Sequence, residues 1–144
     1  MGEPTTLRLL LFRLGPLLCA APASLVREVI PADPPVRIPG AAAAVAGLLN
    51  VRGTLLIVVD GRRAVGLSEC GGSPESVLIL DRGDRAVGLT VDVVEDLIEV
   101  ESASLIPGAA MPGVEPRLAK AVGEHAGLVF AVLDTEALFA PHLG

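Results

Sequence analysis

The feature that most constrains the fold is the shortness of the apolar runs in this chain. Many of these runs end at glycine, proline or aspartate. Runs of this length rich in Val, Leu and Ile are too short for helices and are typical of β-strands. Two of them, Leu48–Val51 and Leu55–Val59, flank an Arg52-Gly53 pair and predict a hairpin. Gly53 suits a turn with positive φ, and Arg52 would stand at the tip, facing either water or a partner.

The same signals predict the elements on either side of that hairpin. A first hairpin is expected around Gly15-Pro16, and a proline-rich loop precedes the second hairpin. The predicted segments are strands at 7–14 and 17–21, a short helical turn at 22–29, a loop at 31–40, a short helix within 60–67 and a connecting loop at 68–76.

The second half of the chain repeats this order. A predicted hairpin, Val77–Leu80 and Arg85–Val91, overlays the first one when Gly83 is placed on Gly15, an offset of 68 residues. The segment 127–134 overlays 53–60 at an offset of 74, and each is followed by a short helix, the second at Thr135–Phe139. We therefore expect a single domain over 1–144, mainly β, in which the halves 7–67 and 77–139 produce two small barrels of about five strands each.

Composition excludes several classes of function. The chain has no Trp or Tyr, three Phe and a net charge of −6, which disfavours nucleic-acid binding. Residues 1–72 carry a net charge of +2 and residues 73–144 carry −8, a split that favours head-to-tail contacts between unlike halves. No uncharged run has the length of a membrane helix, and Cys19 and Cys70 are expected to be reduced thiols in the cytoplasm.

No pattern in the sequence indicates catalysis. Neither His125 nor His142 has the spacing of a metal site, and no glycine-rich loop follows a strand and opens a helix. The carboxylates between Asp92 and Glu101 alternate with apolar residues, so they predict a solvated strand face, with acid/base chemistry as the alternative. We expect no enzyme activity, no metal and no cofactor.

Four motifs together resemble the CheW family of chemotaxis coupling proteins, over about residues 7 to 139. The most specific of them is the Asn50-x-Arg52-Gly53 hairpin placed before a Val-Val-Asp strand end at Asp60. The residues that carry the resemblance are Phe12, Leu14, Gly15, Ala20 or Ala21, Val26, Glu28 and Val29; Pro39, Val45, Gly47, Asn50, Arg52 and Gly53; Asp60; and Gly88, Leu89, Val91, Asp92 and Val94.

The resemblance implies a fold and a set of partners. The barrels would be five-stranded SH3-like β-barrel subdomains with short helices, and the protein a non-catalytic scaffold that links chemoreceptors to a CheA-type histidine kinase. It implies binding to the regulatory domain of the kinase and to the cytoplasmic tip of the receptors, assembly into rings, and recruitment from the cytoplasm to membrane-associated receptor arrays. The residues implied in binding are Arg52, Glu28, Val26, Val29, Asn50, Gly53, Val91 and Val93, with Gly47 and Asp60 as structural turn and strand-end positions.

Two departures from the family pattern bear on the choice of partner. Ile57 stands where family members usually have proline, which should leave a more regular strand, and Gly61 follows Asp60, which should loosen that junction. An adaptor of the same fold in another signalling array, such as twitching or developmental control, therefore stays open. A small hydrolase that uses the carboxylates between Asp92 and Glu101 is a second alternative.

Overall fold

The computed structural model describes residues 5–67 and 73–143, and this part of the chain is mainly β. Its strands are β1 (Thr6–Leu14), β2 (Leu17–Pro22), β3 (Val26–Pro31), β4 (Val45–Val51), β5 (Thr54–Asp60), β6 (Ser76–Arg82), β7 (Arg85–Val91), β8 (Val93–Glu101), β9 (Ile106–Pro107), β10 (Ala119–His125) and β11 (Leu128–Leu133). Its helices are the short η1 (Ala23–Leu25), η2 (Ser102–Ser104) and η3 (Pro116–Leu118), with α1 (Gly61–Ala64) and α2 (Thr135–Leu143).

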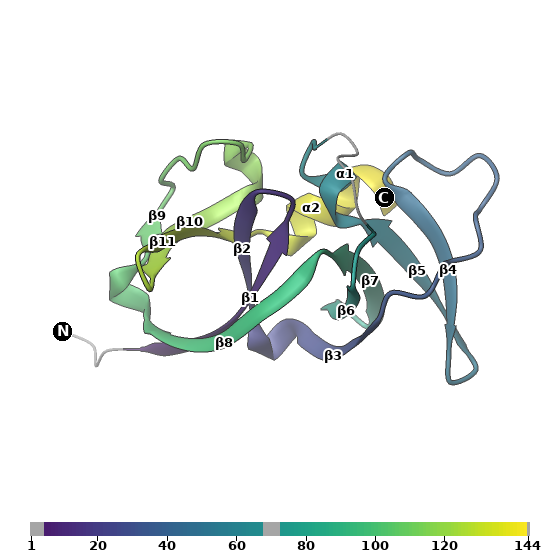
Figure 1. The fold of residues 1–144 in the computed structure, drawn as a ribbon, viewed down its shortest axis with the longest axis horizontal. Helices are drawn as coiled ribbons and strands as arrows, with labels where there is room; N and C mark the ends of the chain where they lie inside the picture. The colour runs from purple at the N-terminus through teal and green to yellow at the C-terminus, as the bar shows by residue number, and fades with distance from the viewer. Residues whose placement is uncertain (1–4, 68–72, 144) are drawn as a thin grey trace.

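The strands form two sheets that lie side by side along the long axis of the molecule (Figure 1). One has the order β8-β1-β2-β11-β10-β9 and the other the order β3-β6-β7-β5-β4. Both include one parallel pair, β2 with β11 and β7 with β5, among antiparallel neighbours. The mainly β fold with two SH3-like subdomains is thus confirmed, with six strands in one sheet where five were expected.

The two halves of the sequence exchange their first hairpins. The β1–β2 hairpin joins β8, β10 and β11, whereas the β6–β7 hairpin joins β3, β4 and β5. Each sheet therefore combines the first hairpin of one half with later strands of the other half. The boundary predicted at 68–76 does not separate the sheets, and its residues 68–72 lie outside the described part of the chain.

Local irregularities follow the predicted duplication. A bulge interrupts the pairing of β3 with β6 between Val26 and Glu28. A bulge also interrupts the pairing of β8 with β1 between Val94 and Asp96, which are the residues 68 positions after Val26 and Glu28. A second pair of bulges lies in β4 between Val45 and Gly47 and in β10 between Ala119 and Ala121, at an offset of 74. Because bulges set where a strand bends, equivalent strands of the two sheets bend at equivalent positions.

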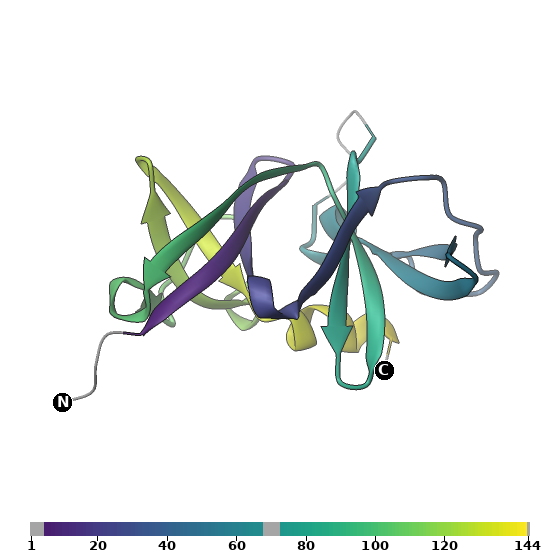
Figure 2. The same cartoon turned by 90° about the horizontal axis from the view of Figure 1, so that it is seen from below.

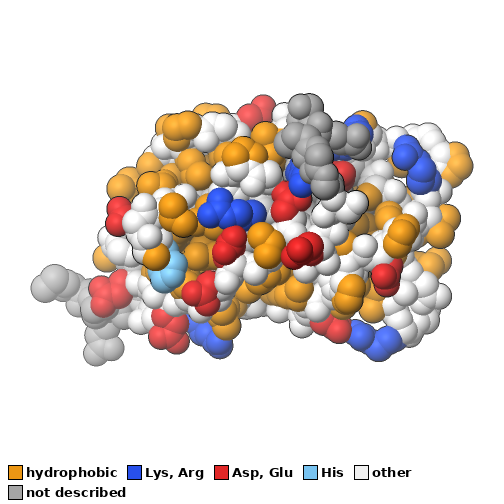
Figure 3. Space-filling view, viewed as in Figure 1, with side chains coloured by type: hydrophobic (Ala, Val, Ile, Leu, Met, Phe, Trp, Pro, Cys, Tyr) orange, Lys and Arg blue, Asp and Glu red, His pale blue; other side chains and the backbone are white. Residues whose placement is uncertain are grey.

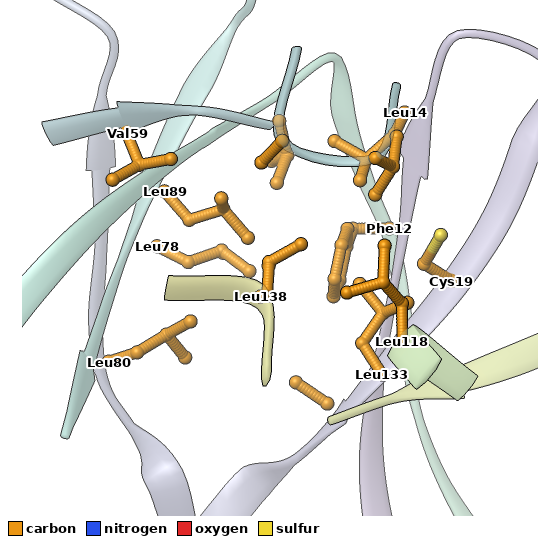
Figure 4. Close-up of a cluster of buried hydrophobic side chains, with 14 of the residues drawn as sticks. Phe12, Leu14, Cys19, Val59, Leu78, Leu80, Leu89, Leu118, Leu133 and Leu138 are labelled. Atoms are coloured by element: carbon orange, nitrogen blue, oxygen red, sulfur yellow. The ribbon is translucent and has the colours of Figure 1, made fainter. Parts of the chain in front are cut away.

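A shared hydrophobic core joins the sheets. Helix α2 runs along one side of the molecule where the two sheets meet (Figure 2), and its Leu138 and Phe139 enter this core. Leu138 of α2 is 1% exposed and points between side chains of both sheets, with Leu78 and Leu89 on one side and Phe12 on the other (Figure 4). Burial of apolar side chains from both sheets in one cluster disfavours independent movement of the subdomains.

Two local expectations were wrong. The segment predicted as a helical turn over 22–29 is helical only in η1, and Val26 to Val29 belong to β3, because the edge of β6 offers this segment backbone hydrogen bonds. The last helix continues past Phe139 to Leu143 and includes Pro141, where burial of Leu138 and Phe139 outweighs the loss of one backbone donor.

Candidate functional site

The Arg52-Gly53 pair is the two-residue turn of the β4–β5 hairpin. Arg52 has φ of 51° and Gly53 has φ of 85°, and Val51 pairs directly with Thr54 across the turn. Positive φ at both central residues defines the turn type whose twist matches that of the flanking strands. The Gly53 N–H donates to Asn50 Oδ1 at 2.8 Å, so Asn50 holds the turn closed.

Arg52 reaches from this turn to Glu28 on β3 and makes two parallel hydrogen bonds with its carboxylate. Arg52 Nη1 donates to Glu28 Oε1 at 3.0 Å, and Nη2 donates to Oε2. Because β3 and the β4–β5 hairpin lie at opposite ends of one sheet, the pair connects the two ends of that curled sheet. The Arg52 side chain nevertheless stays 71% exposed, which leaves its outer face free for contact with another protein.

Hydrogen bonding from Arg52, followed by its charge, lowers the pKa of the Glu28 carboxyl below its ordinary value of 4.5. The contribution of this pair to the free energy of unfolding is therefore complete at pH values above the ordinary pKa of 4.5. It is lost as the pH falls through the lowered pKa of Glu28 in the folded protein. A carbon-13 NMR titration should show the Glu28 midpoint below 4.5 and an upward shift in Arg52→Ala.

The matched control is Arg82→Ala. Arg82 makes a similar bidentate pair with Glu136 and lowers the pKa of that carboxyl. This change should raise the Glu136 midpoint and leave Glu28 unmoved. A Glu28 midpoint that is the same with and without Arg52 would contradict the pairing.

The structure brings only some of the other implied binding residues to this surface. A shallow pocket of about 320 Å³ lies between β3 and the hairpin, with Glu28, Val51 and Arg52 in its wall. Val29 is 42% exposed on the same strand as Glu28, whereas Val26 packs partly against the core.

Two further valines lie away from this surface. Val91 is 1% exposed and belongs to the core, so its side chain is not available to a partner in this conformation. Val93 is half-buried at the start of β8, on the other sheet from Arg52.

Gly47 and Asp60 have local structural tasks. Gly47 lies at the bulge of β4 with φ of 148°, and a Cβ there would overlap the carbonyl oxygen of Val36. Asp60 Oδ1 accepts from Arg63 N at 3.2 Å and caps the N-terminus of α1. Asp134 accepts from Ala137 N at the start of α2, again at an offset of 74.

A second bidentate pair, between Arg62 and Asp92, was not anticipated from the sequence. Arg62 Nε donates to Asp92 Oδ2 at 3.0 Å and Nη2 donates to Oδ1, while the Gly15 N–H also donates to this carboxylate. The two side chains are only 18% and 16% exposed. The expectation that Asp92 belongs to a solvated strand face was therefore wrong, because Asp92 precedes β8 and turns inward to join α1 to the β1–β2 turn.

Two of the other carboxylates in this segment lie beside basic side chains. Glu95 pairs with Arg13 at 2.8 Å, and Asp96 lies 3.8 Å from His125. Within residues 5–67 and 73–143, no three His, Cys, Asp or Glu side chains gather as metal ligands. In the same residues, no helix is both long and apolar enough to cross a bilayer.

An ion pair that is anchored at a hairpin turn and exposed on one of two sheets with a shared core is suited to contact with another protein. The profile of the CheW-like domain matches residues 8–141. The chain belongs to the CheW-like domain family.

Curated relatives and a solved structure agree with this assignment. The chain is 32% identical over 100 residues to the chemotaxis protein CheW of Rhizobium meliloti, a match that covers 69% of this chain and 64% of that protein. It is 26% identical to a probable chemotaxis protein CheW of Rhizobium etli, over 92% of this chain and 86% of the relative. The fold matches the crystal structure of the scaffolding protein TtCheW from Thermoanaerobacter tengcongensis with a TM-score of 0.86 and 21% identity, over 95% of this chain and 90% of that one.

Proposed function

We propose that this protein couples chemoreceptors to a CheA-type histidine kinase and works in the cytoplasm at receptor arrays. The observation that carries the proposal is the pair between Arg52 and Glu28. It holds a guanidinium in a fixed place at a hairpin tip while most of that side chain stays exposed. A preorganised charge of this kind binds a carboxylate on a partner with little further loss of side-chain entropy.

Exposed apolar side chains accompany this charged site. On the five-stranded sheet they are Val29, Leu55 and Ile57, and Val36 lies beside β4 in an isolated bridge to Leu48. Charged side chains of both signs lie among apolar ones on the face seen in Figure 3. Mixed surfaces of this composition are typical of non-obligate protein interfaces, and several such contacts in an array would support one another.

Charge exchange between Arg52 and Glu28 tests whether Arg52 itself contacts the partner. Calorimetry would measure binding to the regulatory domain of a histidine kinase from the same genome, and separately to a receptor-tip hairpin. We expect Arg52→Glu to weaken at least one of these by about fivefold or more, as for a lost charge-assisted contact. The double variant Arg52→Glu with Glu28→Arg should bind as weakly as the single variant. It restores the ion pair, but the positive charge now lies on β3 and not at the hairpin tip.

The corresponding exchange at Arg82 and Glu136 is the control, since it alters an ion pair of the same geometry elsewhere on the protein. It should leave both affinities unchanged. Recovery of binding in the Arg52/Glu28 exchange would show that the pair only shapes the loop. Absence of any binding by the unaltered protein to such kinases and receptors would overturn the proposed coupling role.

A further inference from the structure

A cavity of about 610 Å³ opens at one end of the six-stranded sheet, away from the Arg52–Glu28 pair. Its apolar wall includes Leu9 of β1, Ala121 of β10 and Val132 of β11, which are between 1% and 8% exposed. Leu105 and Pro22 extend this wall. The volume and the apolar lining are those of pockets that hold small organic ligands.

Two cationic side chains, Arg8 of β1 and Lys120 of β10, also line the cavity. Most of the arginines in the described part of the chain are held in ion pairs or hydrogen bonds, including Arg13, Arg27 and Arg52. Within residues 5–67 and 73–143, neither Arg8 nor Lys120 forms such an interaction through its side chain. Arg8 faces Glu99 across the β1–β8 pairing, yet no ion pair joins the two.

The duplicated architecture shows that the fold itself does not require these charges. In the other sheet, the positions equivalent to Arg8 and Lys120, at offsets of 68 and 74, are Ser76 and Ala46. Ala46 lines a separate pocket of about 510 Å³ at the corresponding end of that sheet, together with Thr90, the equivalent of Pro22. The pocket beside Ala46 is lined by Arg37 and Arg63 together with the carboxylates Asp33 and Asp60. Among the described residues, the cavity beside β1 is lined by Arg8 and Lys120 and by no carboxylate.

We propose that this cavity binds a small amphiphilic monocarboxylate, such as a medium-chain fatty acid. The alkyl chain would lie against Leu9, Ala121 and Val132, and the carboxylate would lie at the mouth, where Arg8 and Lys120 supply donors. Removal of the chain from water drives binding, and charge-assisted hydrogen bonds select the anionic head group. This site is separate from the surface assigned to kinase and receptor binding.

The test is a titration of the full-length protein with octanoate, followed by amide NMR. We expect saturable shifts at Leu9, Ala121 and Val132, and a higher melting temperature in the presence of octanoate because the ligand binds the folded state. Octanol and octylammonium carry the same chain without the negative charge and should bind at least about tenfold more weakly, as expected for loss of a charge-assisted contact.

Arg8→Gln and Lys120→Gln should each weaken octanoate binding by several fold without altering the circular dichroism spectrum. Arg85→Gln is the matched control, because Arg85 is another exposed arginine whose side chain has no partner in the described part of the chain, and it does not line this cavity. It should leave binding unchanged. The absence of saturable shifts, equal binding of octanol, or an equal effect of Arg85→Gln would each overturn the proposal, and none of these results would bear on kinase coupling.

Discussion

Replacement of Phe12 with alanine is expected to lower the free energy of unfolding by about 4 kcal/mol, because it removes one of the largest fully buried side chains. Phe12 is 0% exposed and lies in the cluster that contains side chains from both sheets and from α2 (Figure 4). Its strand, β1, pairs with β2 on one side and with β8 on the other. Loss of the ring would leave a cavity that neighbours on the two sheets cannot fill without moving toward each other.

Urea unfolding followed by far-ultraviolet circular dichroism is the appropriate measurement, because the chain has no Trp or Tyr for fluorescence. Phe12→Leu should cost much less, about 1 kcal/mol, since it keeps most of the buried volume. Leu55→Ala, at a side chain that is 66% exposed, should change stability by less than about 0.5 kcal/mol. A loss below about 1.5 kcal/mol in Phe12→Ala would contradict the shared core.

Replacement of Gly61 with alanine is expected to lower the free energy of unfolding by roughly 3 kcal/mol, through overpacking. A Cβ at this position would overlap the carbonyl oxygen of Thr90 and lie 2.6 Å from Leu14 Cδ2. The Gly61 N–H also donates to Thr90 Oγ1 at 3.1 Å, so the backbone of α1 is held against β7. The expected loosening of the junction after Asp60 is therefore wrong, because the missing side chain permits close contact instead.

Gly53→Ala is the matched control for this prediction, measured by the same urea unfolding. A Cβ at Gly53 meets nothing within 4 Å, but φ of 85° is costly for alanine, so a loss of about 1 kcal/mol is expected. If the two substitutions cost the same, steric overlap at Gly61 would not be the cause.

Much of the candidate site could be predicted because its signals are local. A glycine after an exposed residue, between two short apolar runs, indicates a hairpin tip, and the structure has Arg52 and Gly53 there with positive φ. The bidentate contact between Arg52 and Glu28 is not a local signal. The residues are 24 positions apart, and the β4–β5 hairpin that carries Arg52 at its turn does not pair with β3, which carries Glu28. The family resemblance placed both residues in a binding surface but did not imply this geometry.

The partly buried ion pair between Arg62 and Asp92 and the cavity could not be predicted for the same reason. In the sequence, Asp92 is one carboxylate in an alternating strand pattern. Its side chain points inward because it accepts hydrogen bonds from Arg62 and from the Gly15 N–H, which are distant in the sequence. Arg8 and Lys120 lie 112 positions apart in the sequence and share a cavity only because β1 and β10 belong to one sheet.

The sequence by itself determined the positions of the tight turns, most of the short strands beside them and the duplicated order of the elements. These follow from apolar runs and from glycines that satisfy local backbone geometry. Only the tertiary structure decided that the first hairpins are exchanged, so that β1–β2 joins β8, β10 and β11 while β6–β7 joins β3, β4 and β5. The two similar hairpins have similar apolar faces, and either arrangement satisfies the local pattern. The choice between them depends on packing of distant side chains in the shared core, which no local pattern encodes.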